Sequence, residues 1–386
     1  MEGWELRRLG DLCAFDKTQG IHTNLPYVGL EHIESGTSQF LGSIEPTDVK
    51  SSTFKFNNSH VLYGRLRPYL NKVLLPDFEG HCSTEIFPIQ VKPGLLREYL
   101  CHWLMSESVV ESINATCTGA RMPRADMNEV LNFNIPVPSE QRQHRIVTLL
   151  DEAFADIATA KANAEKNLQN ARELFNSHLD AIVVHAQENG EIVALSELAT
   201  DITDGDHMPP PKVEQGLPFI TIGNIDKQTR SIDFSDTFKV PREYFDGLKA
   251  NKKPMRGDVL YTVTGSFGIP VLVEDDTEFC FQRHIGLIRP KADVDSTWLH
   301  YLLQSPQAFN QAADGATGTA QKTVSLKVLR NLQVPRISPK DQLAHVETLR
   351  SVEAECRRLE SIYRQKLSAL DDLKKSLLHQ AFSGQL

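Results

Sequence analysis

The chain has 386 residues, of which 40% are hydrophobic and 24% are charged. This composition excludes a fully disordered chain, and the length suits two domains better than one core. The longest apolar runs, residues 181–184 and 271–273, are far too short to span a bilayer. The N-terminus lacks a basic start followed by an apolar stretch, so we expect no signal peptide and a cytoplasmic location.

The charge gives no direct indication of a nucleic-acid partner. The net charge is −9, and residues 1–139, 140–190, 191–339 and 340–386 carry −4, −3, −3 and +1. Phosphate contacts normally come from clustered lysine and arginine. Any DNA binding would therefore use local basic patches or share the electrostatic attraction with a partner subunit.

Short motifs recur in the same order in the two halves of the chain. The matches pair residues 9–12 with 195–198, 26–33 with 218–225, 61–63 with 259–261, Cys82 with Cys280, 118–120 with 317–319, and 134–136 with 333–335. The offset grows along the chain, as expected for two diverged copies with small loop insertions. Chance similarity is the alternative, but chance matches would not keep their order. We predict an internal repeat of residues 1–187 and 188–386.

Each copy is predicted to contain a globular part followed by a long helix. Residues 59–63 and 258–263 are typical of strands, because β-branched and aromatic residues stand next to glycine. Residues 99–112 and 297–312 have the periodicity of amphipathic helices. Prolines within 135–138 and 334–337 are expected to stop regular structure and close each globular part.

The two long helices have a coiled-coil pattern. Apolar residues recur mostly every three or four positions, charges fill the other positions, and each helix lacks glycine and proline for about 40 residues. The apolar stripe of each helix, roughly 60 Å long at 1.5 Å per residue, needs a partner. The helix of the other copy is the natural partner, and a coiled coil between two chains is the alternative.

The predicted fold is α+β, with two α/β domains joined by a long antiparallel two-helix coiled coil in an internal pseudo-two-fold repeat. The predicted domains are residues 1–139, a helix at 140–187, residues 188–339, and a helix at 340–386. Two domains held at a fixed separation would suit two half-sites on a duplex. The same architecture would suit a protein scaffold equally well.

Several segments resemble the specificity subunits of type I restriction-modification enzymes, and they follow the order of that family. They are WELRRLGD (4–11) and ITDGDH (202–207) at the openings of two recognition domains, IPVPSEQ (135–141) at the joint to the helix, TGTAQKTVS (317–325) in a late loop, and LLHQAFSGQL (377–386) at the end. Together these segments extend the resemblance over essentially the whole chain.

The resemblance implies that each α/β target recognition domain reads one half of a bipartite, asymmetric double-stranded DNA site. The coiled coil would space the half-sites and dock two modification (methyltransferase) subunits, which would carry S-adenosylmethionine and flip out an adenine for N6 methylation. Restriction (motor-nuclease) subunits would join for cleavage. The chain itself would be non-catalytic and hold no cofactor or metal.

The residues themselves give no catalytic constellation. The sequence has no Asn/Asp-Pro-Pro-aromatic motif, no P-loop and no Gly-x-Gly-x-x-Gly after a predicted strand. The segment from Asp204 to His207 is interpreted as a turn, with a metal cluster as the alternative. Residues 264–268 are interpreted as a tight turn, with a phosphate cradle as the alternative. The six cysteines form no C-x-x-C pair, which favours buried thiols over disulfides or zinc.

The candidate DNA contacts are polar and basic residues in loops. The candidates are Arg65, Arg67 and Lys72, which Tyr63 and Tyr69 interleave, Arg121 and Arg124 in a glycine loop, and Thr264, Ser266, Arg283, His284, Gln321 and Lys322 in the second copy. Arginine can pair with guanine and glutamine with adenine, although phosphate contacts are commoner. An ordinary surface role is the alternative for each. The first glycine loop has Met122-Pro123 where the second has Gln321-Lys322.

Three other functions remain open at this point. A coiled-coil adaptor with two protein-binding domains would share the architecture. A self-contained enzyme would have to bind S-adenosylmethionine in the isolated chain, which the missing motifs argue against. A related system with a fused methylase and nuclease would differ only in the partner proteins.

Overall fold

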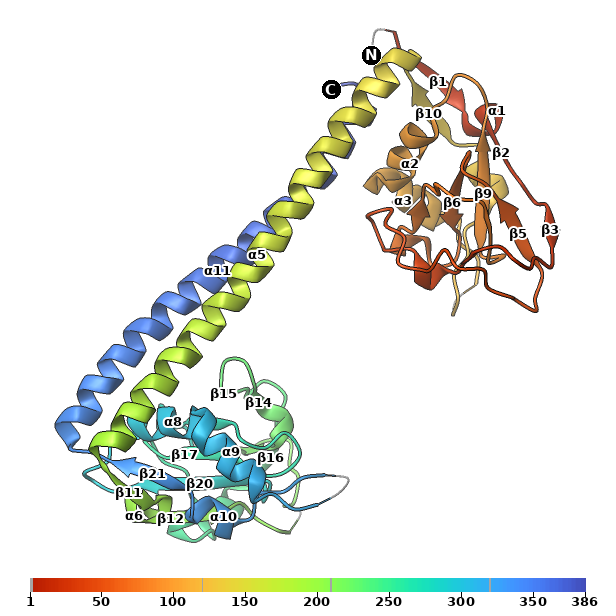
Figure 1. Ribbon diagram of the computed structural model, residues 1–386. Helices are drawn as coiled ribbons and strands as arrows, with labels where there is room; N and C mark the ends of the chain where they lie inside the picture. The colour runs from red at the N-terminus through yellow and green to blue at the C-terminus, as the bar shows by residue number, and fades with distance from the viewer. Residues whose placement is uncertain (1–2, 120, 209, 319–320) are drawn as a thin grey trace. The chain divides into compact units, whose positions relative to one another are not determined.

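The computed structural model describes residues 3–119, 121–208, 210–318 and 321–386. The chain divides into two compact units, unit 1 with residues 1–166 and 364–386 and unit 2 with residues 167–363. The long helices α5 (Glu140–Asn189) and α11 (Pro339–Ser383) each contribute to both units (Figure 1). Within the described ranges, no helix combines the length and apolar character needed to span a membrane.

Unit 1 is built on two four-stranded sheets and a two-stranded ribbon. The first sheet is antiparallel, with the order β2 (Cys13–Phe15), β9 (Ile86–Val91), β6 (His60–Gly64) and β7 (Val73–Leu74). The second has the order β3 (Gln19–Gly20), β5 (Thr53–Phe56), β8 (Gly80–Cys82) and β4 (Tyr27–Val28), with β4 parallel to β8. The ribbon pairs β1 (Glu5–Arg8) with β10 (Asn134–Val137). Its helices are α1 (Leu9–Leu12), η1 (Leu30–His32), η2 (Pro68–Leu70), α2 (Arg97–Met105), α3 (Glu107–Ala115) and α4 (Met127–Val130).

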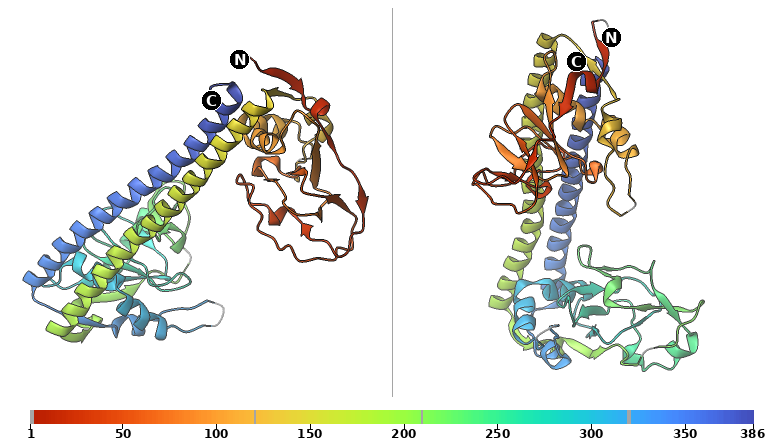
Figure 2. Two further views of the ribbon diagram at one scale, coloured as in Figure 1. Left: turned by 45° about the horizontal axis from the view of Figure 1, so that its top comes forward. Right: turned by 90° about the vertical axis from the view of Figure 1, so that its right-hand side faces the viewer.

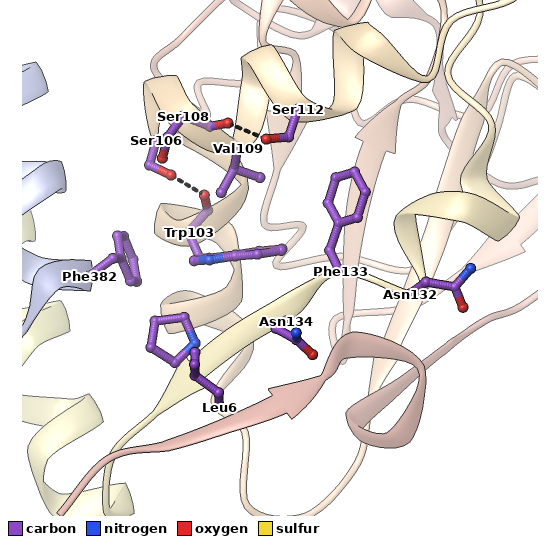
Figure 3. A pocket seen from close by; sticks show the side chains of 11 residues that line it. Leu6, Trp103, Ser106, Ser108, Val109, Ser112, Asn132, Phe133, Asn134 and Phe382 are labelled. Atoms are coloured by element: carbon purple, nitrogen blue, oxygen red, sulfur yellow. Dashed lines mark hydrogen bonds between the residues drawn. The ribbon is translucent and has the colours of Figure 1, made fainter. Parts of the chain in front are cut away.

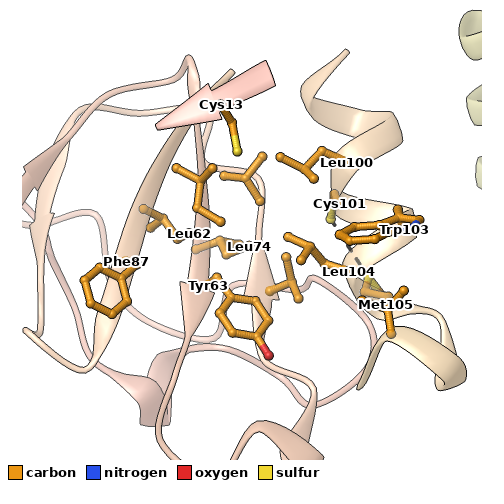
Figure 4. Close-up of a cluster of buried hydrophobic side chains, with 14 of the residues drawn as sticks. Cys13, Leu62, Tyr63, Leu74, Phe87, Leu100, Cys101, Trp103, Leu104 and Met105 are labelled. Atoms are coloured by element: carbon orange, nitrogen blue, oxygen red, sulfur yellow. Dashed lines mark hydrogen bonds between the residues drawn. The ribbon is translucent and has the colours of Figure 1, made fainter. Parts of the chain in front are cut away.

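Helix α2 covers the first sheet of unit 1 and closes its core. Leu62, Tyr63 and Leu74 of the sheet lie against Leu100 and Leu104 of the helix, and all five are at most 3% exposed (Figure 4). Burial of each such side chain contributes about 1.5–3 kcal/mol relative to exposure. This packing holds the end of β6, where the loops described below begin.

Unit 2 repeats this architecture, but its second sheet has three strands where that of unit 1 has four. Its four-stranded sheet has the order β12 (Ala199–Asp204), β20 (Ile285–Pro290), β17 (Val259–Thr262) and β18 (Pro270–Leu272). The second sheet has the order β16 (Phe238–Val240), β13 (Leu217–Ile220) and β19 (Cys280–Phe281). The other strands form the hairpin β14 (Ile225–Asp226) and β15 (Ser231–Ile232), and the ribbon β11 (Glu191–Ala194) and β21 (Gln333–Arg336). The helices are α6 (Leu195–Leu198), η3 (Ile222–Asn224), α7 (Arg242–Asp246), η4 (Ala250–Lys252), α8 (Ser296–Gln304), α9 (Pro306–Asp314) and α10 (Leu326–Arg330).

The strand registers confirm the predicted repeat and correct one of its matches. In unit 1, Val28 pairs with Cys82. In unit 2, Ile220, the counterpart of Val28, pairs with Phe281. Phe281 is therefore the counterpart of Cys82, and the match between Cys82 and Cys280 was wrong by one residue. The second copy carries one more residue between β17 and β19, which the short sequence matches did not reveal.

Each predicted amphipathic helix is in fact two helices. The break falls at Ser106 between α2 and α3 and at Ser305 between α8 and α9. Both serines have extended backbones, and their hydroxyls donate to the carbonyls of Trp103 at 2.8 Å and Leu302 at 2.7 Å. The hydroxyl competes for a carbonyl of the helix, and Pro306 can begin a helix but cannot continue one.

The prolines expected to stop regular structure lie inside short strands. Pro136 of β10 faces Leu6 of β1, and Leu9 N–H donates to the Phe133 carbonyl at 2.8 Å. Hydrogen-bonded and non-hydrogen-bonded pairs alternate in an antiparallel ladder. Because Pro136 takes a non-hydrogen-bonded position, its missing N–H costs no ladder bond. Pro335 of β21 has the same place opposite Ile192.

The long helices pair with each other inside each unit and run antiparallel, as predicted for one chain. In unit 1, Lys161 contacts Asp371 at 2.8 Å. In unit 2, Arg172 contacts Glu360 at 3.3 Å. Figure 2 shows α5 and α11 side by side in both views. The three-to-four-residue spacing of apolar residues also predicts Leu149 and Leu373 in the buried stripes, but their side chains are 41% and 47% exposed.

A buried glutamine fastens the start of each long helix to its globular domain. Gln143 is fully buried, accepts from Leu96 N–H at 2.9 Å, and donates to the carbonyls of Gly94 at 2.9 Å and Pro138 at 3.1 Å. Gln342 makes the same three bonds in unit 2, to the backbone of Asp295, Asp293 and Ile337. A single buried side chain thus satisfies three backbone groups and sets where each helix leaves its domain.

Replacing Gln143 with leucine should destabilise unit 1 by about 1–3 kcal/mol, because the buried Pro138 carbonyl would lose its partner and two partly buried hydrogen bonds, to Leu96 and Gly94, would be lost. Chemical denaturation measures the change in the free energy of unfolding. Gln141→Leu, at an exposed position on the same turn, is the matched control and should change it by less than about 0.5 kcal/mol. Equal effects of the two variants would contradict the assigned role of Gln143.

Candidate nucleic-acid interface

Three loops of unit 1 meet at the end of β6, and we call them the first loop cluster. They are the turn at 65–71, the turn at 83–85, and the glycine loop at 117–125, whose Ala120 lies outside the described residues. Arg65 N–H donates to the Glu85 carbonyl, and the Arg65 carbonyl accepts from Ala125 N–H, both at 2.9 Å. Arg67 N–H donates to the Pro123 carbonyl at 2.8 Å. Backbone bonds therefore hold the three loops together.

The same bonds form a second loop cluster at the end of β17, from residues 263–268, 282–284 and 316–324. Val263 N–H donates to the His284 carbonyl at 2.9 Å, Val324 N–H to the Val263 carbonyl at 2.8 Å, and Gly265 N–H to the Lys322 carbonyl at 3.1 Å. Lys322 thus takes the place of Pro123, which confirms the alignment of Met122-Pro123 with Gln321-Lys322. Thr319 and Ala320 of this loop lie outside the described residues.

The turn after the central strand needs a left-handed residue in both clusters. Arg67 has a φ of 52°, and its counterpart Gly265 has a φ of 74°. Glycine adopts this conformation without the strain that a side chain brings. In unit 1 the residue in this left-handed conformation is Arg67, whose side chain makes the conformation strained. Arg67 is exposed, and its guanidinium has no hydrogen-bond or ion-pair partner among the described residues.

Glu85 holds two of the predicted contact residues inside the first loop cluster. Its carboxylate lies 2.8 Å from Arg124 Nη2 and 3.1 Å from Arg65 Nε, and the Arg65 guanidinium lies 5.2 Å from the centre of the Phe87 ring. Burial alone would raise the pKa of Glu85, but hydrogen bonding to Arg124 and the positive charges of both arginines outweigh it and lower the pKa. The charge of Glu85 therefore stabilises the loop arrangement.

Lys72 is also engaged within the fold. Its ammonium donates to the carbonyls of Leu30 at 2.7 Å and Ile33 at 2.8 Å, at the end of η1. The exposed cations of the first loop cluster are thus Arg67 and Arg121, beside Tyr69, which is 54% exposed.

The second loop cluster exposes a different set of side chains. Arg283, Gln321 and Lys322 are exposed, whereas Thr264 is 7% exposed and forms a backbone bridge with Thr323. Ser266 is half-buried, and its carbonyl accepts from the Thr262 hydroxyl at 2.8 Å.

His284 lies at the turn between β19 and β20, beside Arg283. Burial, together with the charge of Arg283, lowers the pKa of His284 below 6.5. Its imidazole is therefore neutral at neutral pH, so His284 adds no charge to the second loop cluster.

Two segments interpreted as turns have internal partners. In residues 264–268, Gly268 N–H donates to the Thr262 carbonyl at 2.9 Å, as expected of a tight turn. Asp204 pairs with His207 at 2.8 Å, while Asp206 accepts from the Tyr244 hydroxyl at 2.7 Å. Across the described ranges, no group of three or more His, Cys, Asp or Glu side chains is arranged to hold a metal ion.

Sequence reasoning missed Glu85, although the repeat contained a signal for it. Arg65, Glu85 and Arg124 correspond to Val263, His284 and Thr323 in the second copy. An acidic residue and two arginines are thus all absent together from the other copy. When all three charged residues are absent together from one copy, an ion-pair cluster is indicated in the other. This signal can be recognised only when the two copies are aligned without an error of even one residue.

Comparison with known proteins places both copies in one family. The model of the type I restriction modification DNA specificity domain matches residues 1–168 and 187–368. The EcoDI specificity subunit of Escherichia coli is 26% identical over 189 residues, a match that covers 48% of this chain and 41% of that protein. The MjaVIII specificity subunit of Methanocaldococcus jannaschii is 22% identical, over 100% of this chain and 93% of that protein.

Solved structures share the fold over the whole chain. A chain from a study of complex assembly and conformational transition in the type I R-M system has a TM-score of 0.84 at 21% identity, covering 100% of this chain and 99% of that one. The HsdS subunit from Thermoanaerobacter tengcongensis has a TM-score of 0.62 at 20% identity, covering 100% and 98%. At these identities the similarity shows the fold alone.

Replacing Glu85 with glutamine should remove an acid-sensitive part of the stability of unit 1. Because folding lowers the pKa of Glu85 from 4.5, its contribution is present above pH 4.5 and is lost as the pH falls through the folded value. The variant should therefore unfold at lower denaturant concentration than the wild type at neutral pH, and the difference should shrink in acid.

Glu79→Gln is the matched control for this titration, because Glu79 forms an exposed pair with Lys55 that should contribute little. A difference between Glu85→Gln and wild type that stays constant from neutral to acid pH would contradict the role of the Glu85 charge.

Proposed function

Because the chain belongs to the family of type I restriction-modification DNA specificity domains, we propose that it is the non-catalytic DNA-recognition subunit of such a system. It reads a bipartite, asymmetric site, with one loop cluster on each half-site. It docks methyltransferase subunits that modify adenine at N6, together with restriction subunits. S-adenosylmethionine is bound by the methyltransferase partner, and the chain itself supplies recognition.

The observation that carries the proposal is the shared backbone of the two loop clusters combined with their different exposed side chains. The first presents Arg67 and Arg121, and the second presents Arg283, Gln321 and Lys322. Arginine and glutamine can make paired hydrogen bonds to guanine and adenine edges in the major groove. Two loop clusters of one design with different side chains suit two half-sites of different sequence.

The electrostatics favour binding as part of a complex. The net charge of −9 opposes approach to DNA, and Glu85 already neutralises part of the charge of Arg65 and Arg124. Few exposed cations remain in the two loop clusters for phosphate contacts, so the partner subunits supply much of the attraction. Base contacts from this chain then select the sequence.

The test is duplex binding by the chain in complex with its methyltransferase subunit, measured over a range of salt concentrations. Arg67→Ala and Arg283→Ala should each weaken binding. A lost phosphate contact should lower the slope of log affinity against log salt by about 0.9. A lost base contact should cost about 1–3 kcal/mol and relax the sequence preference at one position.

Arg242→Ala is the matched control, because this exposed arginine of α7 pairs with Asp246 and Glu278 and lies outside both loop clusters. Unchanged affinity in both loop variants would remove the loop clusters as the interface. If the complex shows no salt-dependent binding to duplex DNA, that result would contradict DNA recognition and favour the adaptor function.

A further inference from the structure

Unit 1 contains a cavity of about 480 Å³ beside β10 and α3 (Figure 3). Trp103, Phe133 and Phe382 give it apolar walls, and Ser112 and Asn134 bring polar groups to it. Its lining includes no charged residue and no residue of the first loop cluster. The cavity is therefore unsuited to phosphate, and DNA on the loop cluster would leave it accessible.

The edge of β10 at this cavity has unused backbone groups. Leu9 and Phe133 form a hydrogen-bonded pair, so the next pair, Arg8 and Asn134, is non-hydrogen-bonded. The N–H and C=O of Asn134 consequently point away from β1. Pro136, two residues further along the same edge, accepts from the Tyr99 hydroxyl of α2 at 2.7 Å. Within the described part of the chain, neither backbone group of Asn134 has a hydrogen-bond partner.

Unit 2 shows which group fits this place. Gln333 is the counterpart of Asn134, and the side chain of Gln311 pairs with its backbone. Gln333 N–H donates to Gln311 Oε1 at 2.7 Å, and Gln311 Nε2 donates to the Gln333 carbonyl at 3.0 Å. A carboxamide has one acceptor and one donor at the spacing that a strand edge offers. Unit 2 thus carries its own occupant.

The counterpart of Gln311 in unit 1 is Ser112, because each lies six residues after the serine that begins its helix. The Ser112 hydroxyl donates to the Ser108 carbonyl of its own helix at 2.8 Å and does not bond to the backbone of Asn134. Gln307, which bonds to Asp180 in unit 2, is likewise replaced by Ser108. The cavity is open in unit 1 because two glutamines of the repeat are serines there.

We propose that an asparagine or glutamine side chain of the methyltransferase subunit occupies this cavity and bonds to the backbone of Asn134. This inference rests on the proposed function, which requires that subunit to dock on the chain. The carboxamide takes the place that Gln311 fills in unit 2, and Trp103 and Phe133 contact the apolar part of the inserted side chain. Leu6 at the cavity, 67% exposed, extends the contact surface.

Ser112→Gln in the full chain tests the proposal, because it supplies in unit 1 the side chain that unit 2 already has. The variant should bond to Asn134 itself, close the cavity, and weaken binding of the methyltransferase subunit by about tenfold, the value of one or two hydrogen bonds. Calorimetric titration of the chain with the methyltransferase subunit measures the affinity.

Asn114→Gln is the matched control, because it places a glutamine at an exposed position of the same helix outside the cavity lining, and it should bind as the wild type does. Thermal unfolding of Ser112→Gln at or above the wild-type temperature shows that the fold is kept. Wild-type affinity in Ser112→Gln would overturn the proposal and leave water as the occupant. No binding by the unmodified chain would overturn the proposed function, and this inference with it.

Discussion

Each globular domain depends on one buried amide for its attachment to a long helix. The side chains of Gln143 and Gln342 are 0% and 4% exposed, so their hydrogen-bond partners must be groups of the protein. Each satisfies one carbonyl in the segment just before the long helix, and an N–H and a carbonyl in the loop before α2 or α8. The repeat conserves this arrangement while the surrounding loops diverge. Shifting either glutamine by one position would leave all three groups unpaired.

The two copies share this attachment to the long helices but differ in the side chains of their solvent-facing loops. The loop clusters keep the same backbone bonds, but the first is braced by the Glu85 carboxylate and the second is not. The first copy has an ion-pair cluster of Arg65, Glu85 and Arg124, whereas the residues at the same positions in the second copy are neutral. The two surfaces should therefore respond differently to salt and acid. The exposed side chains differ while the backbone is kept, which suits the proposed recognition of two half-sites of different sequence.

Local periodicity explains how much of the fold was predictable from the sequence. The long helices and the repeat are visible because apolar spacing and motif order need no knowledge of distant contacts. The break between α2 and α3 at Ser106 was not predicted, because the amphipathic spacing of apolar residues continues across it. The match of Cys82 with Cys280 failed, because one inserted residue is invisible among short motifs.

The candidate site was less predictable for a related reason. Lys72 and Arg124 were selected for their charge, but their partners, the Leu30 carbonyl and the Glu85 carboxylate, are far away in the sequence. Only the folded chain separates a cation that is held internally from one that is free, such as Arg67. Composition could not identify the candidate site, because a net charge of −9 says nothing about where the exposed arginines lie.

Single-molecule sequencing of N6-methyladenine in the source genome, with and without this gene, is the decisive measurement of whether the chain directs methylation. We expect methylation at one split, asymmetric motif to disappear when the gene is deleted and to return when it is restored. An unchanged methylation pattern, in cells that express the partner methyltransferase, would contradict a role in DNA recognition.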